Sequence, residues 1–114
     1  MKGLRRPPAT ERFKNNRTGD VIEAIREAIQ SIPRGRVSSY GQVAAAAGYP
    51  RHVRMVPRVL NLHGDGLPWH RVLGADGLIK LPAESEREQK LRLQAEGVRF
   101  RGGKVDMATH QHVW

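Results

Sequence analysis

Two short helical segments joined by a glycine-containing corner constrain the fold of this chain more than any other feature of its sequence. The first segment begins at Ser39, has a small apolar face over residues 43–47, and ends at Gly48, a residue type favoured just beyond a helix C-terminus. After a corner at Tyr49-Pro50, residues 51–62 form the second segment. This order predicts a helix-turn-helix, although many helical hairpins bind nothing.

The second segment separates apolar and basic side chains onto different faces. The inward positions are Val53, Val56 and Leu60. The outward positions are Arg51, Arg54 and Arg58. Both sets follow helical spacing. Pro57 lies inside the predicted helix, where it removes an N–H and is expected to kink the axis.

A longer helix is predicted before this pair, over residues 20–32. Its apolar residues recur on one face at helical spacing, and they are Val21, Ile22, Ile25, Ile29 and Ile32. Asp20 is the expected N-cap, with Glu23 completing a capping box, and Pro33 and Gly35 end the helix. Residues 1–19 are rich in Arg, Pro, Asn and Thr without an apolar period, so we expect a flexible basic arm there.

After the pair, the sequence predicts a fourth helix and small β elements. The turn at residues 75–77 suggests that Leu78-Ile79 pairs back as a strand. Ser85 and Glu88 form a capping-box pattern for a helix over residues 86–96, closed by Gly97. Residues 98–105 predict a hairpin, and the tail to Trp114 is expected to pack on the body. The predicted fold is therefore a mainly α winged helix-turn-helix DNA-binding domain over residues 20–114, with small β elements.

The charge distribution points to a polyanionic partner. The chain carries 20 Lys and Arg against 11 Asp and Glu, a formal net charge of +9. Between Glu27 and Asp65 there is no acidic residue, but five arginines lie in that interval. A long stretch of one sign inside a folded domain favours nucleic-acid binding, although a solvated face of a basic protein is an alternative.

Several classes of chemistry are disfavoured by what the sequence lacks. The chain has no cysteine, so it has no disulfide, thiolate metal site or thiol nucleophile. Its histidines show no ligand spacing beyond His110 and His112, so we expect no metal and no cofactor. No apolar run approaches the roughly 20 residues of a membrane span, and no secretory signal is present. We expect a monomer without membrane contact, in the cytoplasm and associated with the nucleoid.

Several motifs in order resemble a known family. They are IPRGRVSSYGQVA, GYPRHVRMV, Asn61, PWHRV and the Glu96-Gly97 pair. Together they resemble the C-terminal domain of O6-alkylguanine-DNA alkyltransferases over roughly residues 20–100. The alkyltransferase motif is Pro-Cys-His-Arg-Val, and here Trp69 stands at the position of the nucleophilic cysteine. This substitution in a short chain is similar to the alkyltransferase-like proteins, which bind O6-alkylguanine in DNA and direct it to nucleotide excision repair.

The resemblance implies a non-catalytic DNA-damage recognition protein that flips the damaged nucleotide out of duplex DNA. Tyr40 would press on the phosphate 3′ to the lesion, and Arg54 would fill the gap that the flipped base leaves. Trp69 would pack against the flipped guanine, and Val72 would line the same pocket. His70, which matches the family's base histidine, also belongs to the predicted lesion-binding set. Ser39, Arg51 and Arg58 complete the predicted DNA-binding set, with the two arginines contacting phosphates or nothing.

Other residues that match the family are expected to support the pocket. Asn61 and Glu96 would satisfy buried polar groups, and Arg71 would brace the loop that carries Trp69. The family usually has glycine where Pro57 stands, and its glycine-rich pocket loop is replaced here by residues 80–85, which we expect to form a different pocket edge. The expected partners are double-stranded DNA containing O6-alkylguanine and nucleotide excision repair proteins.

Two alternatives remain at this point. A winged helix-turn-helix transcriptional regulator would read DNA sequence and show no lesion specificity. An active transferase would need another acceptor residue, because the thiol is absent.

Overall fold

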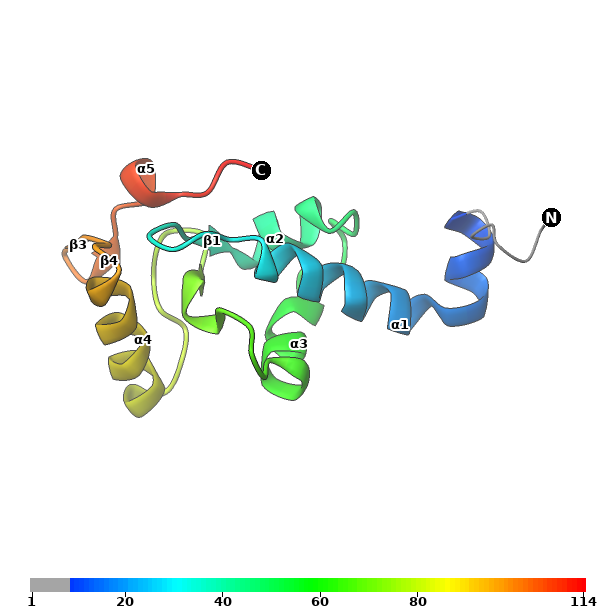
Figure 1. Ribbon diagram of the computed structural model, residues 1–114, viewed down its shortest axis with the longest axis horizontal. Coiled ribbons are helices and arrows are strands. Elements are labelled where there is room, and N and C mark those ends of the chain that lie inside the picture. Colours follow the sequence, from blue (N-terminus) through cyan, green and yellow to red (C-terminus); the bar gives the residue numbers. More distant parts are fainter. Residues whose placement is uncertain (1–8) are drawn as a thin grey trace.

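Three helices pack together at the centre of the molecule in the computed structural model, which describes the backbone of residues 9–114 and the side chains of residues 18–114. They are α1 (Ala9–Gln30), α2 (Tyr40–Ala46) and α3 (Met55–His63). Figure 1 shows α2 and α3 lying along the C-terminal part of α1. The structure confirms the mainly helical fold with small strands.

The first helix begins at Ala9 rather than at Asp20, so Asp20 lies inside α1 and is not its N-cap. An apolar period reports the buried face of a helix and not its length, which is why it did not locate the start. The predicted inward face is confirmed, because Val21, Ile25, Ile29 and Ile32 are buried. Of the predicted arm, residues 9–19 have helical backbone and residues 1–8 lie outside the described part of the chain.

The second helix follows its N-cap Ser39 and carries a full capping box. The Ser39 hydroxyl accepts a hydrogen bond from the Gln42 N–H at 3.1 Å. The Gln42 side-chain oxygen accepts one in return from the Ser39 N–H at 3.2 Å. The helix ends at Ala46, and Gly48 takes the predicted C′ position after the C-cap Ala47. The φ of Gly48 is 91°, the left-handed conformation that glycine adopts without strain. Tyr40 is thereby fixed as the first residue of α2.

The third helix begins at Met55, later than residue 51. Pro57 therefore lies in the first turn, where no intrahelical partner needs its missing N–H and a proline does not require a kink. The inward face also differs from the prediction, because Val56 and Val59 are buried whereas Val53 is 37% exposed.

A two-stranded parallel sheet joins the helix pair to the second half of the chain. Strand β1 (Ser38–Ser39) pairs with β2 (Val72–Leu73), with Ser38 opposite Val72. The short 3₁₀ helix η2 (Trp69–Arg71) immediately precedes β2. The pairing therefore brings the start of α2 close to η2. The predicted strand at Leu78-Ile79 is wrong, because these residues form no strand, although the Leu78 carbonyl accepts a hydrogen bond from the Gly74 N–H.

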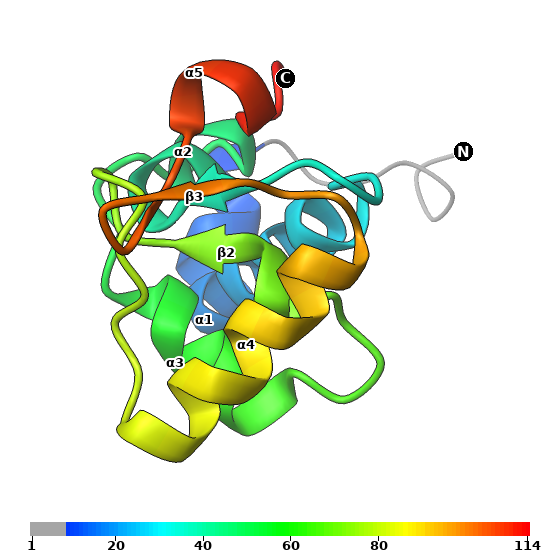
Figure 2. The same ribbon diagram turned by 90° about the vertical axis from the view of Figure 1, so that its left-hand side faces the viewer.

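The C-terminal third contains a polar helix and a hairpin. Helix α4 (Ala83–Ala95) begins after Pro82, so Ser85 lies within its first turn and the predicted Ser85–Glu88 capping box is wrong. The hairpin is confirmed as β3 (Phe100–Arg101) and β4 (Lys104–Val105). Helix α5 (Met107–His110) follows, and the tail packs on the body as predicted, with Trp114 Nε1 donating to Ser38 Oγ at 3.3 Å. Figure 2 shows α4 crossing the end of the molecule that carries β2.

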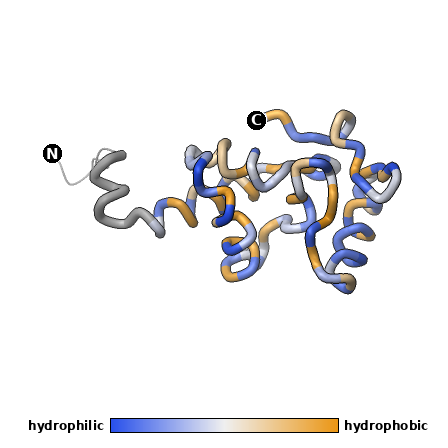
Figure 3. Tube along the Cα trace, turned by 180° about the vertical axis from the view of Figure 1, so that it is seen from behind, coloured by the Kyte–Doolittle hydropathy of each residue, from blue (hydrophilic) through white to orange (hydrophobic). Residues whose placement is uncertain are grey.

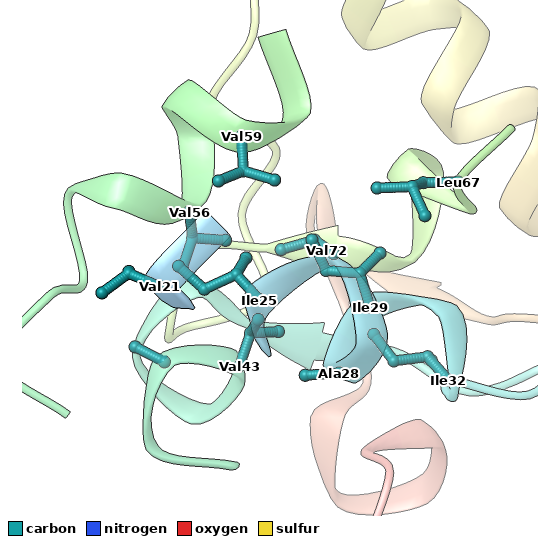
Figure 4. Close-up of a cluster of buried hydrophobic side chains, with 11 residues drawn as sticks. Val21, Ile25, Ala28, Ile29, Ile32, Val43, Val56, Val59, Leu67 and Val72 are labelled. Carbon is teal, nitrogen blue, oxygen red and sulfur yellow. The ribbon is translucent and has the colours of Figure 1, made fainter. Parts of the chain in front are cut away.

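The core has two parts. The larger joins α1, α2 and α3 with Leu67 and Val72, and Figure 4 shows these side chains converging between the helices. The smaller part contains Val37, Leu73, Leu93, Val98 and Val105. Helix α4 is largely hydrophilic along its trace (Figure 3), and its buried side chains are Gln89 and Leu93. Within residues 9–114, every helix is too short or too polar to span a bilayer.

Candidate functional site

A pocket with a volume of about 340 Å³ lies where α2, α3, η2 and the start of α4 meet. This volume is within the range of sites that bind small molecules. The lining residues are Tyr40, Pro57, Leu60, Asn61, Gly64, Asp65, Trp69, Val72, Leu81 and Ser85. Aliphatic and aromatic side chains dominate this set, with polar groups at a few positions, so the pocket suits a flat, mostly apolar group that carries several hydrogen-bonding atoms.

Trp69 is the larger of the two aromatic side chains that line the pocket. It is the first residue of η2 and is partly buried. The His70 ring meets the indole edge-on, with 6.1 Å between ring centroids and an interplanar angle of 82°. The Arg92 guanidinium lies over the indole, with its Cζ 5.4 Å from the ring centroid.

A buried network of charged groups lies directly after Trp69 in the chain. His70 Nε2 is 2.7 Å from Glu96 Oε2. Arg71 donates from Nε to Glu96 Oε1 at 3.0 Å and from Nη2 to Oε2 at 2.7 Å. It also donates from Nη1 to the Ile32 carbonyl at 2.8 Å, which ties η2 to the segment that follows α1. In this network Arg71 links η2 to both Glu96 and the Ile32 carbonyl.

Glu96 also receives a hydrogen bond from the Gly35 N–H to its Oε1, at 2.9 Å. Gly35 has a φ of 83°, so only a residue that tolerates the left-handed region directs its N–H this way without strain. Burial acts to raise the pKa of Glu96, but the hydrogen bonds from Arg71, Gly35 and His70 outweigh it and lower the pKa to about 2. Glu96 is therefore a carboxylate at neutral pH and a fixed negative charge beside His70.

Gln89 fastens α4 to the segment that carries Trp69. Its side chain is 1% exposed and its Nε2 donates to the His70 carbonyl at 3.0 Å and to the Val72 carbonyl at 2.9 Å. Because both acceptors belong to η2 and β2, α4 cannot shift without breaking buried hydrogen bonds. The position of the pocket wall thus depends on a glutamine that no sequence motif marks.

Tyr40 lies on the side of the pocket formed by α2. Burial raises the pKa of its phenol above the ordinary value of 10.0. The side chain is half-buried, so it remains a neutral hydroxyl that can approach an anion without charge repulsion. The neighbouring Ser39 is 5% exposed, and its hydroxyl caps the helix that carries Tyr40.

The three predicted arginines lie together at the start of α3, outside the pocket. Arg51 lies in the preceding turn, Arg54 occupies the N-cap position, and Arg58 is in the helix. All three are exposed. Their charges add to the positive end of the helix dipole, so this surface is suited to phosphate groups.

Some pocket residues were missed or misassigned from the sequence. Asn61 lines the pocket with an exposed side chain and is not a buried supporting residue. Leu81 and Ser85 form the pocket edge expected from residues 80–85. The sequence did not indicate that Arg92 contacts Trp69, because an arginine on a polar helix is usually a solvated charge.

Among residues 18–114, no group of three His, Asp or Glu side chains is placed to hold a metal ion.

Comparison with known proteins agrees with this geometry. The profile of the 6-O-methylguanine DNA methyltransferase DNA-binding domain matches residues 20–98. The DNA base-flipping protein of Vibrio parahaemolyticus is 46% identical over 72 residues, which cover 61% of this chain and 72% of that protein. Alkyltransferase-like protein 1 of Schizosaccharomyces pombe is 36% identical over 86 residues, which cover 72% of this chain and 80% of that protein.

The fold has a solved counterpart. The crystal structure of S. pombe Atl1 in complex with damaged DNA containing O6-carboxymethylguanine superposes with a TM-score of 0.75. The two chains are 29% identical, and the match covers 85% of this chain and 98% of Atl1. The fold described above is therefore similar to that of a protein solved in complex with damaged DNA.

Proposed function

Because the chain belongs to the family of the 6-O-methylguanine DNA methyltransferase DNA-binding domain, we propose that it binds O6-alkylguanine in duplex DNA and does not accept the alkyl group. One observation carries the proposal. Trp69 lines a pocket beside the intact His70–Glu96–Arg71 network, in a chain without cysteine. By its resemblance to the alkyltransferases, the chain has an aromatic ring at the position of their reactive cysteine.

The chemistry of Trp69 is suited to binding and not to transfer. Removing an alkyl group from guanine O6 requires a soft, activated nucleophile such as a thiolate. An indole ring is not a nucleophile at neutral pH, and His70 has no thiol from which to take a proton. An indole does stack on a base, which contributes about 1–3 kcal/mol per base. The protein is therefore a recognition module and not an enzyme.

Nucleotide flipping connects the pocket to the duplex. The pocket reaches the O6 position of a guanine only if the base leaves the stack, at a cost of a few kcal/mol. Relatives of this chain are named DNA base-flipping proteins, which supports the same route here. In our proposal, Tyr40 contacts the phosphate 3′ to the flipped nucleotide, because its neutral hydroxyl lies on the pocket wall at the start of α2.

The arginines at the start of α3 serve the duplex and not the flipped base. We assign Arg54 to the gap left in the stack, because a guanidinium is planar and stacks on bases. Arg51 and Arg58 contact phosphates on the same surface. Val72 forms the wall next to Trp69, and His70 lies behind Trp69 in contact with Glu96. Arg71, Glu96 and Ser39 hold the elements that carry the contacting residues.

In our proposal, other proteins remove the lesion. A protein that binds the alkylated base without transfer leaves the damage in the DNA, so repair requires an excision pathway. We propose that the monomeric complex on duplex DNA shields the lesion and marks it for nucleotide excision repair, in the cytoplasm with the nucleoid.

The test compares duplexes that differ by one methyl group, each in two unrelated sequence contexts. We expect tighter binding to the O6-methylguanine duplex than to the guanine duplex in both contexts. A transcriptional regulator would instead prefer one sequence and ignore the methyl group. Mass spectrometry of the protein after incubation tests the transferase alternative, because a stoichiometric methyl adduct would refute the non-catalytic assignment.

A further inference from the structure

The contact between Arg92 and Trp69 joins the pocket to a residue outside it. The Arg92 guanidinium lies over the indole at 5.4 Å from Cζ to the ring centroid, which is a cation–π distance. Arg92 is not among the residues that line the pocket. It therefore contacts the indole from outside the cavity, while Trp69 presents a surface to the cavity.

Arg92 is held in this position by an ion pair with its side chain and by the anchoring of its helix. Its Nε and Nη2 each lie 2.8 Å from Glu88 Oε2, one turn earlier on α4. The helix itself is fastened to η2 through the buried Gln89 bonds to the His70 and Val72 carbonyls. The helix that carries Arg92 and the turn that carries Trp69 consequently form one unit.

Restraint of Trp69 has a consequence for binding. A side chain that must be ordered when a ligand arrives reduces the affinity for that ligand, whereas a preorganised side chain does not. Trp69 is only partly buried, and His70 contacts it edge-on. Burial and the His70 contact therefore leave part of the indole for Arg92 to cover. A guanidinium suits this surface because it is flat and always charged.

We propose that Arg92 is a positioning residue that acts through Trp69, and that Glu88 keeps Arg92 over the indole. The inference rests on the proposed function, because Trp69 must contact the flipped base for its restraint to matter. Arg92 then contributes to selectivity for the lesion and not to general affinity for DNA. A phosphate-contacting arginine would have the opposite signature, because it strengthens binding to damaged and intact DNA alike.

The first measurement is the ratio of affinities for the O6-methylguanine and guanine duplexes. R92Q should lower this ratio roughly two- to fivefold, the size expected for loss of an exposed cation–π contact. The matched control is R87Q, which removes an exposed arginine from the same helix and should leave the ratio unchanged. R92K should restore part of the ratio, and E88Q should lower it less than R92Q does.

The second measurement reports on the indole itself. Trp69 and Trp114 are the two tryptophans of the chain, so W114F leaves Trp69 as the sole tryptophan. In that background, R92Q should increase both the quenching of Trp69 by acrylamide and the rotational freedom seen in its fluorescence anisotropy. R87Q should change neither.

The outcomes separate this inference from the proposed function. If wild-type protein prefers the lesion but R92Q keeps the full ratio, or R92Q weakens both duplexes equally, Arg92 does not act through Trp69. A lower ratio with unchanged Trp69 quenching also overturns the inference. If wild-type protein shows no preference for the lesion, the proposed function itself fails.

Discussion

His70 Nε2 lies 2.7 Å from Glu96 Oε2, directly beside the tryptophan that lines the pocket. Arg71 donates to the same carboxylate, and the side chain of Glu96 is only 6% exposed. The effect of these contacts is to hold η2, and therefore Trp69, against the segment from Ile32 to Gly35 that follows α1.

The first prediction concerns the stability that this network provides. E96Q leaves Arg71 without its carboxylate partner, so we expect it to lower the free energy of unfolding by about 3 kcal/mol. Urea denaturation at pH 7 measures this change. The matched control is E88Q, which removes the exposed partner of Arg92 and should cost less than about 1 kcal/mol. Equal costs for the two variants would contradict the role of Glu96.

The second prediction concerns pH. Hydrogen bonds in the folded state lower the pKa of Glu96 from 4.5 to about 2. The carboxylate therefore contributes stability that is complete above pH 4.5 and is lost as the pH falls toward 2. Urea midpoints measured across this window should fall more steeply for wild-type protein than for E96Q. Parallel curves for the two proteins would show that Glu96 does not carry the effect.

These contacts show what the sequence could and could not predict. The inner face of α1 could be predicted because apolar residues such as Ile25 and Ile29 repeat at helical spacing. The order of motifs around Trp69 indicated which residues share a pocket. The first residues of α3 and α4 could not be predicted, because the sequence does not tell whether a proline such as Pro57 lies in a first turn or in a helix interior. The contact of Arg92 with Trp69 could not be predicted because it depends on which loop α4 covers.

A third prediction concerns Tyr40. Y40A removes both the ring and the hydroxyl from the pocket wall, so we expect it to impair flipping of the damaged nucleotide. A fluorescent base analogue beside the lesion reports flipping, because its emission rises when its neighbour leaves the stack. Y40F keeps the ring and isolates the hydroxyl, and its signal should fall between those of wild type and Y40A. An unchanged signal in Y40A would refute the assignment.

A fourth prediction distinguishes the arginines at the start of α3. If Arg54 enters the stack, R54A should weaken lesion binding at least tenfold, or about 1.4 kcal/mol, without a loss of thermal stability. R58A removes an equally exposed arginine and should weaken binding to damaged and intact duplexes by the same factor, with a smaller salt dependence. Fluorescence anisotropy titrations at two salt concentrations measure both effects. Unchanged affinity in R54A would show that another residue fills the gap.

The most direct test of the account follows the fluorescence of Trp69 while DNA binds. In W114F, Trp69 is the sole tryptophan, and an alkylated guanine stacked on its ring should quench its emission. We predict strong quenching by the O6-methylguanine duplex and little by the guanine duplex, compared at equal occupancy of the protein. Equal quenching by the two duplexes, or none by either, would contradict the claim that the pocket receives the damaged base against Trp69.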